Sequence, residues 1–365
     1  MEKKKNAKIV IGMVGAVYLL LTCLCLFKSP EQYSLSERRE LAQKPEITWS
    51  SFVSGKYAVS AEKYVTDQFP LRDSLRSLKA YFSLGIMKKA DVNGIYEKDG
   101  YLCAMEYPMD EASVARAAEL FGTIYDKNLK DTEASVYFSI IPDKSYFLAD
   151  EKYLSMDYEA FFHEMYGQTD FLTAIPIEEK LQLSDYYKTD THWKQEEVTD
   201  VAAYMAKQMG VTLSGEYQVV ALDTPFYGVY SGQAAVTVVP DEIRYCTNAV
   251  LEQCRVYDYE NDKEIVLYDE SKAAGRDAYE MFLGGNISLT VIENPTVPSG
   301  KELVVFGDSF SRSMVPLLAE GYAKTTLIDI RYLPSAYIGN YIEFTNQDVL
   351  FLYSTSVLNN SITIK

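Results

Sequence analysis

Histidine is scarce in this chain: the 365 residues contain only two, His163 and His192, together with two tryptophans and five cysteines. So few imidazoles exclude the paired-histidine metal centres of metal-dependent deacetylases. The absence of any Cys-x-x-Cys pair argues against a zinc ribbon or a dithiol redox site. Neither Gly-x-x-x-x-Gly-Lys nor Gly-x-Gly-x-x-Gly occurs, so nucleotide chemistry has no support. We therefore expect no metal and no cofactor.

The charge is one-sided, with 35 lysines and arginines against 52 acids and a net charge of −17. Nucleic acid and anionic lipid both repel such a chain, so neither is expected as its main partner. Hydrophobic residues make up 48% and charged residues 24%, a composition that supports a folded core. The length allows one large domain or two of ordinary size.

The first 28 residues indicate that the protein is targeted to a membrane. "MEKKKNAK" supplies four lysines, and an uncharged run of 19 residues, 9–27, precedes Lys28. About 20 apolar residues cross a bilayer as a helix, and lysines before the run keep that end in the cytoplasm. A cleaved signal peptide and an uncleaved signal-anchor both fit; we favour the anchor, because the run is long and lacks an Ala-x-Ala site. The protein is then expected in the cell membrane, single-pass, with everything after Lys28 extracytoplasmic.

Three cysteines, Cys103, Cys246 and Cys254, lie outside the apolar run. In an oxidising compartment the last two can close a short hairpin as a disulfide. Free or buried thiols fit the sequence equally well.

Apolar spacing and turn residues predict the organisation of the rest. Residues 29–55 are polar and punctuated by proline, as is typical of a tether, and the main domain is expected over 56–365 with a β-rich insertion at about 217–270. The patterns predict two helices in 56–90 separated at Pro70, a hairpin at 93–102, a helix at 110–128, a strand at 134–144 and a helix at 195–210.

The C-terminal third has the clearest pattern. It predicts an apolar strand that runs into a Gly-Asp-Ser turn at 301–310, a helix at 311–323 and further strands at 325–332 and 348–354. Strands that are continuous apolar runs alternating with helices indicate an α/β fold with a mostly parallel sheet covered on both faces.

Ser309, in "VVFGDSFS", lies where the first of these strands turns into a helix. Active groups of open α/β sheets lie beyond the carboxyl ends of strands, and helix N–H groups there can stabilise an oxyanion. Ser309 is therefore a candidate nucleophile. The alternative is that Ser309 and Asp308 cap the following helix.

His192, in "KTDTHW", is the candidate base for that serine. In an extended segment Asp190 shares a face with His192, because side chains alternate along a strand. Asp190 can then hold the imidazole in the correct tautomer, as in a Ser-His-Asp triad. The alternative is a structural histidine, which is how we interpret His163. A single-metal site from Asp190, His192 and Asp308 is conceivable but poorly supported.

Two further segments offer groups for the same site. In "FLGGNISL", Gly285 permits close backbone approach and Asn286 can donate to an oxyanion, although a plain turn fits as well. In "IDIRY", Arg331 and Tyr332 can bind substrate, or Arg331 can pair with Asp329. Thirty tyrosines are enough to line an aromatic groove that binds a polysaccharide, although most are expected in the hydrophobic core and at its edge.

The segments "KTDTHW", "FLGGN", "FGDSFSRSMVPLL", "IDIRY" and "DVLFLY", in this order, resemble the DHHW protein family. They are also similar to the related periplasmic alginate O-acetyltransferases, whose domain is SGNH-hydrolase-like, with Asp-x-His before the serine. The resemblance covers roughly 36–360 and includes the early "ERRELAQKP", "DQFPLR" and "NGIYEKDGYL". It implies a three-layer SGNH-like α/β/α catalytic domain after an N-terminal transmembrane helix.

When the family's catalytic roles are carried over to the matching positions, the resemblance implies that Ser309 is the acyl nucleophile, His192 the base and Asp190 the partner that orients it. Asp308 is then structural. The family name expects a second histidine where this chain has Thr191, which leaves the pair intact but puts subfamily and substrate in question. The resemblance also implies a membrane-bound acyltransferase as the acetyl donor.

Three functions fit these residues. The leading hypothesis is a membrane-anchored O-acetyltransferase that modifies a cell-surface or secreted polysaccharide through an acetyl-serine. An acetyl esterase would use the same three residues with water as the acceptor. A non-catalytic polysaccharide-binding or assembly protein would need no contact between Ser309 and His192.

Overall fold

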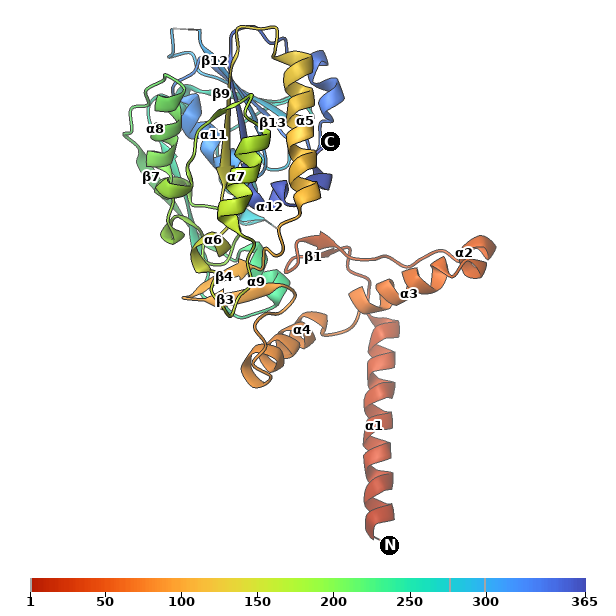
Figure 1. The fold of residues 1–365 in the computed structure, drawn as a ribbon. Helices are drawn as coiled ribbons and strands as arrows, with labels where there is room; N and C mark the ends of the chain where they lie inside the picture. The colour runs from red at the N-terminus through yellow and green to blue at the C-terminus, as the bar shows by residue number, and fades with distance from the viewer. Residues whose placement is uncertain (1, 276, 299) are drawn as a thin grey trace. The chain divides into compact units, whose positions relative to one another are not determined.

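The structure, a computed structural model, describes residues 2–275, 277–298 and 300–365 (Figure 1). It contains two compact units. The N-terminal unit comprises the described residues up to Val92 together with Gly232–Thr237. The sheet unit comprises Asn93–Ser231 and the described residues of Val238–Lys365. The boundary at residue 56 between the tether and the main domain stays a prediction.

The N-terminal unit begins with a long apolar helix, α1. Its span Ala7–Cys25 is long and apolar enough to cross a membrane. The elements of this unit are α1 Glu2–Phe27, β1 Tyr33–Ser34, β2 Arg39–Glu40, α2 Trp49–Val53, α3 Lys56–Asp67, α4 Arg72–Tyr81 and the π-helical η1 Phe82–Ile86. Two helices separated near Pro70 were predicted, and α3 and α4 confirm them.

Ion pairs hold the N-terminal unit together. Arg39 binds Asp67 through two hydrogen bonds, of 2.9 and 2.6 Å, and this contact lowers the pKa of Asp67 to about 2. Arg72 and Arg76 of α4 lie 2.5 and 3.4 Å from Glu37. Because α3 and α4 both bind the segment that carries β1 and β2, residues far apart in sequence form one body.

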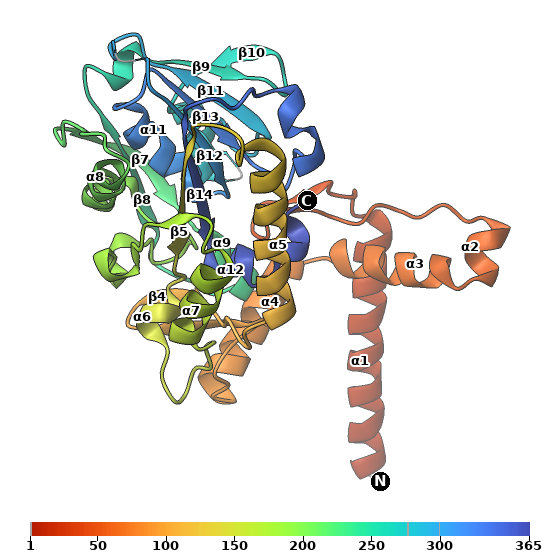
Figure 2. The ribbon, with the colours of Figure 1, turned by 45° about the horizontal axis from the view of Figure 1, so that its top comes forward.

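The sheet unit is built on eight strands in the order β10-β9-β11-β13-β12-β14-β5-β6. The run from β13 to β6 is parallel, whereas β11, β9 and β10 pair antiparallel at one edge (Figure 2). The bounds are β5 Ser135–Ile141, β6 Thr173–Ala174, β9 Arg255–Asp258, β10 Lys263–Ile265, β11 Leu289–Glu293, β12 Glu302–Gly307, β13 Lys324–Ile328 and β14 Asp348–Ser354.

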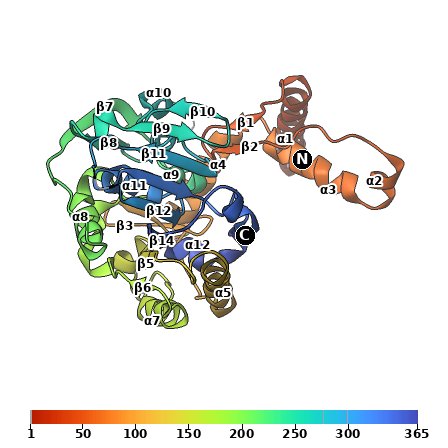
Figure 3. The ribbon, with the colours of Figure 1, turned by 90° about the horizontal axis from the view of Figure 1, so that it is seen from above.

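Helices cover both faces of this sheet. Along β12, Leu303 and Val305 pack on the face of α8 and α11, whereas Val304 and Phe306 pack on the face of α5 and α7 (Figure 3). Burial on both faces explains the uninterrupted apolar run. The helices are α5 Glu111–Asn128, α7 Tyr158–Gln168, α8 Thr199–Gln208 and α11 Ser311–Ala319. The predicted three-layer α/β/α fold is confirmed.

Several shorter elements complete the chain. They are β3 Ile95–Lys98, β4 Tyr101–Ala104, α6 Ser145–Leu148, β7 Gln218–Phe226, α9 Val229–Ala234, β8 Asp241–Thr247, α10 Glu270–Ala273 and α12 Thr355–Leu358. β3 and β4 form the predicted hairpin. In the β-rich region β7 pairs with β8, but β9 and β10 extend the central sheet. Cys246 and Cys254 are free thiols.

Candidate active site

Ser309 lies in a tight turn between β12 and α11. The Asp308 carboxylate before it accepts hydrogen bonds from the backbone N–H of Phe310, at 3.0 Å, and from both the N–H and hydroxyl of Ser354, at 2.8 and 2.6 Å. Asp308 thus joins this turn to the end of β14. All three contacts are structural, in line with the role that the resemblance implied for Asp308.

The structure brings Ser309 and His192 together although they are 117 residues apart. The Ser309 hydroxyl lies 2.8 Å from Nε2 of His192, and Nδ1 of the same ring lies 2.6 Å from Oδ1 of Asp190. A serine hydroxyl donating to Nε2, with Nδ1–H donating to a buried carboxylate, is the geometry of a Ser-His-Asp triad.

The loop that carries Asp190 and His192 is bent rather than extended, so the strand conformation considered for it is wrong. The Asp190 carboxylate turns back and accepts the His192 backbone N–H at 3.2 Å. Its second oxygen accepts the N–H of Val229 at 2.8 Å. Neighbouring Gly228 lies so close that a Cβ would stand 2.2 Å from the carbonyl carbon of Thr189, which explains the glycine.

Trp193 anchors this loop on the helix that follows the serine. Its indole N–H donates to the Ser313 hydroxyl at 2.8 Å and to the Phe310 carbonyl at 3.2 Å. Gln195 adds a side-chain bond of 2.6 Å to the Ser313 carbonyl. The tryptophan after His192 therefore has a structural purpose, because it fixes the imidazole against α11.

Tyr279 is a site residue that the sequence did not reveal. Its ring stacks on the His192 imidazole with 3.8 Å between centroids and 8° between planes. Its hydroxyl lies 2.7 Å from that of Ser313. The stack covers one face of the imidazole and fixes its plane. One tyrosine among thirty carries no sequence signal.

A second buried layer supports the histidine loop. The Tyr230 hydroxyl lies 3.0 Å from that of Thr191 and 3.2 Å from the Asp143 carboxylate. Lys144, fully buried, donates to the Tyr187 carbonyl at 2.9 Å. Burial raises the pKa of Asp143 and lowers that of Lys144. Thr191, where the family name expects histidine, thus links the loop to this layer.

Glu106 makes stability depend on pH. Burial, and then the charge of Asp143, raise the pKa of Glu106 from 4.5 to about 7. Between these values the folded chain holds a proton that the unfolded chain has lost, so the free energy of unfolding falls as pH rises through this window. We expect Glu106→Gln to remove about 1–3 kcal/mol of that fall, measured by denaturant titrations of both proteins from pH 4.5 to 7.5. Identical slopes in the two proteins would contradict the assignment.

Asn286 is tied to the first turn of α11. Its Oδ1 accepts a hydrogen bond from the Arg312 guanidinium, and Arg312 follows Ser309 by three residues. Gly285 has a left-handed φ of 89°, and a Cβ there would meet the Glu280 side chain at 2.9 Å. Glycine is therefore required by the turn, and Asn286 is the member of this segment that reaches the serine helix.

Arg331 adopts the ion-pair alternative. It holds Asp329 through two hydrogen bonds, of 2.9 and 2.6 Å, and Arg312 approaches the same carboxylate at 3.8 Å. Although burial opposes its charge, the bond to Asp329 raises the pKa of Arg331. Tyr332 is half exposed, with the Arg331 guanidinium 5.6 Å from its ring centre. The predicted strand 325–332 ends at Ile328, so these groups lie on the following loop.

The helix amides proposed for an oxyanion are already engaged. The N–H groups of Phe310, Ser311 and Arg312 donate to the Asp308 carboxylate, the Asp308 carbonyl and the Ser309 carbonyl, respectively. The expectation that helix N–H groups stabilise an oxyanion is therefore wrong for these three. His163 lies exposed on α7, and across the described ranges no group of three His, Cys, Asp or Glu side chains is placed to hold a metal.

The comparisons with known proteins bear on this region. Residues 179–328, which contain all three triad members, match the model of one protein family. That family is the DHHW protein family. The predicted resemblance is confirmed for the DHHW segment. No curated protein sequence matches the chain.

Two solved structures with TM-scores above 0.5 show the same fold at low identity. A DHHW family protein from Eubacterium siraeum DSM 15702 is 19% identical, with a TM-score of 0.61, covering 75% of this chain and 94% of its own. Bacillus cereus PatB1 with a sulfonyl adduct is 18% identical, with a TM-score of 0.58, covering 72% and 95%. The O-acetyltransferase domain of Pseudomonas putida AlgJ is 14% identical, covers 73% and 92%, and has a TM-score of only 0.44, too low to bear on the fold.

Proposed function

We propose that this protein is a membrane-anchored O-acetyltransferase whose extracytoplasmic domain acetylates a cell-surface or secreted polysaccharide. The observation that carries the proposal is the chain of hydrogen bonds from Asp190 through His192 to Ser309. A structural histidine or a helix cap does not need this alignment. The order of the motifs and the DHHW match support the choice of acyl transfer.

In the first half-reaction His192 acts as general base. Nε2 takes the Ser309 proton while Oγ attacks the carbonyl carbon of the acetyl donor and forms a tetrahedral oxyanion. The imidazolium, paired with Asp190 and stacked on Tyr279, then returns the proton to the leaving group. The donor's acyl bond breaks, and Ser309 carries the acetyl ester. Proton transfer of this kind contributes about 10²–10⁴-fold to the rate.

The second half-reaction repeats these steps with a sugar hydroxyl. His192 takes the hydroxyl proton, the sugar oxygen attacks the acetyl-serine carbonyl, and the intermediate collapses to the sugar ester. The proton returns to Ser309 Oγ, which restores the free enzyme. Water in place of the sugar would make the same site an esterase.

The membrane part of the proposal rests on α1. Its apolar span Ala7–Cys25 lies near the N-terminus, with three lysines before it and Lys8 at its start. We propose that it stays attached as an anchor and that a membrane-bound acyltransferase supplies the acetyl group. A membrane donor would meet an anchored acceptor enzyme in two dimensions, which raises its effective concentration.

Partition of the acetyl group between sugar and water tests the transferase assignment. The full-length protein in detergent is given an aryl acetate with and without polysaccharide oligomers, and both phenol release and oligomer mass are followed. We expect phenol release to accelerate and acetylated oligomers to appear. Release that is unaffected by any oligomer, with free acetate as the sole product, would assign the protein as an esterase.

Asn286 is proposed as an oxyanion donor. Arg312 holds its Oδ1, which leaves the Nδ2 protons for a substrate oxygen next to the serine helix. We expect Asn286→Ala to lower kcat for aryl acetate about 10²–10³-fold, the usual cost of one oxyanion donor. Asn261→Ala, an asparagine bonded to Asp258 in another turn, is the control. A kcat within twofold of wild type in Asn286→Ala would remove Asn286 from the site.

A further inference from the structure

The helix α4 and its continuation η1 expose a continuous apolar stripe, Leu71, Leu75, Leu78, Phe82 and Ile86. Steps of three or four residues place Leu75, Leu78 and Phe82 on one helical face. Leu71 is the left-handed residue just before α4, and Ile86 ends the π-helical η1. The exposed fractions of the five side chains, in chain order, are 67, 45, 58, 51 and 55%. Large apolar side chains this exposed in a row mark a surface that meets something else.

The opposite face of α4 is already used within the N-terminal unit. Arg72 and Arg76 bind Glu37 there, and Arg76 also donates to the Gly232 carbonyl at 2.7 Å. The apolar stripe therefore faces away from the unit that carries it. No rearrangement of the helix is needed for the stripe to meet a partner.

Charge separates this unit from the rest of the chain. Residues 29–92, the part of this unit that the proposed anchoring places outside the membrane, contain 10 lysines and arginines against eight acids, whereas residues 93–365 contain 20 against 43. The acidic excess that argued against anionic lipid thus belongs to the sheet unit alone. Exposed Lys79, Lys88 and Lys89 flank the apolar stripe.

We propose that the apolar stripe of α4–η1 docks on the anionic outer surface of the membrane that α1 spans. An amphipathic helix with basic flanks lies in the interface, with its apolar face among the acyl chains and its lysines at lipid phosphates. This inference rests on the proposed anchoring. A second copy is disfavoured as the occupant, since it would bring its own exposed Lys79, Lys88 and Lys89 against the same lysines.

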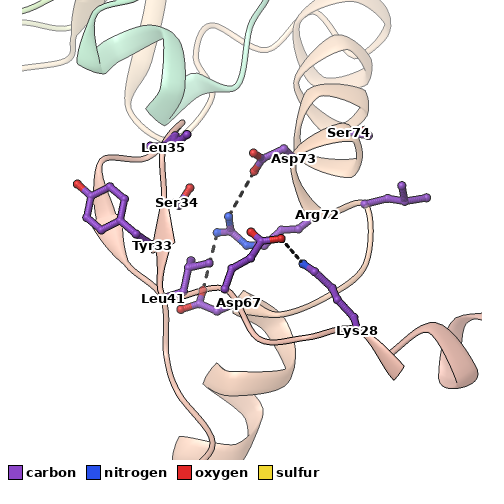
Figure 4. Close-up of a pocket in the computed structure, with 11 residues that line it drawn as sticks. Lys28, Tyr33, Ser34, Leu35, Leu41, Asp67, Arg72, Asp73 and Ser74 are labelled. Atoms are coloured by element: carbon purple, nitrogen blue, oxygen red, sulfur yellow. Dashed lines mark ion pairs between the residues drawn. The ribbon is translucent and has the colours of Figure 1, made fainter. Parts of the chain in front are cut away.

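A nearby cavity of about 480 Å³ does not serve as a phosphate site (Figure 4). Lys28 on its wall pairs with Glu31 at 3.0 Å, and Arg72 lies 3.8 Å from Asp67 and 3.6 Å from Asp73. With both cations already balanced by acids, the lipid contact falls to the exposed lysines beside the stripe.

Tryptophan quenching tests the docking. The full-length chain with Trp49→Phe is reconstituted in vesicles of phosphatidylglycerol and brominated phosphatidylcholine; Trp193 is fully buried and gives a constant background. Leu78→Trp places a probe on the stripe, and Ser77→Trp places a matched probe on the other side of α4. We expect bromine to quench Leu78→Trp several-fold more than Ser77→Trp, and less so when phosphatidylglycerol is replaced by phosphatidylcholine. Phe82→Trp is the second, more conservative probe.

Each outcome of the quenching experiment either supports or overturns membrane docking of the stripe. Equal quenching of the stripe and control probes overturns the proposal. A blue-shifted probe that bromine does not quench, with cross-linked dimers, assigns the stripe to a second copy instead. Flotation of the vesicles reports separately whether α1 anchors the chain, and aryl acetate turnover reports whether the triad works. Failure of docking is thereby distinguished from failure of the proposed function.

Discussion

Replacing Ser309 by alanine is expected to lower the turnover of an aryl acetate by about 10⁴–10⁶-fold, because it removes the hydroxyl that His192 contacts and that would accept the acetyl group. The change removes one partly exposed oxygen and leaves the Asp308 contacts that shape the turn. Steady-state kinetics of phenol release, with circular dichroism to verify folding, measure the effect.

Ser311→Ala is the matched control for this variant. Ser311 begins α11, two residues after Ser309, but its hydroxyl points to the Leu352 carbonyl at 3.3 Å, away from His192. Its turnover should stay near that of wild type. Loss of activity in both variants would indicate damage to the turn, and retained activity in Ser309→Ala would remove the serine from the mechanism.

Replacing Asp190 by asparagine is expected to lower kcat by about 10⁴-fold, because an amide cannot hold the Nδ1–H tautomer or stabilise the imidazolium. The contact is short and fully buried, at 2.6 Å, so water cannot replace it. The shape change is small, and the variant should remain folded. The kcat of aryl acetate turnover, compared over a range of pH, gives the measurement.

Two controls accompany Asp190→Asn. Asp200→Asn changes an exposed acid on α8, and His163→Gln changes the only other histidine. Both should keep near wild-type kcat. A loss of less than tenfold in Asp190→Asn would show that the carboxylate only supports the loop, and that another group orients His192.

β12, β13 and β14 were predictable because each of these strands is buried on both faces, whereas β11 was missed. Such strands are uninterrupted apolar runs: β14 has its predicted bounds, and β12 lies within the predicted segment 301–310. The edge of the sheet was less predictable: β9 and β10 are short and polar, and only tertiary pairing with β11 joins them to the sheet. The loop of Arg331 was mistaken for strand, because Ile330 continues the apolar pattern.

In the candidate active site, the residues that were easiest to predict were those of rare residue types or rare motifs. One histidine beside an aspartate, and one Gly-Asp-Ser turn after an apolar strand, could be paired from sequence alone. Tyr279, Tyr230 and Asp143 could not, because tyrosine and aspartate are common here and their roles depend on contacts across more than 80 residues. The occupied helix amides were likewise invisible, since one bonds to the Asp308 side chain and two bond to backbone carbonyls of the turn.

The account depends most directly on Ser309 being a nucleophile that His192 activates. We would treat the full-length protein with phenylmethanesulfonyl fluoride, digest it and locate the adduct by mass spectrometry, in wild type and in His192→Gln. The prediction is a single sulfonyl group on Ser309 that forms far more slowly in His192→Gln. An unlabelled Ser309, or the same labelling rate without the imidazole, would contradict the account.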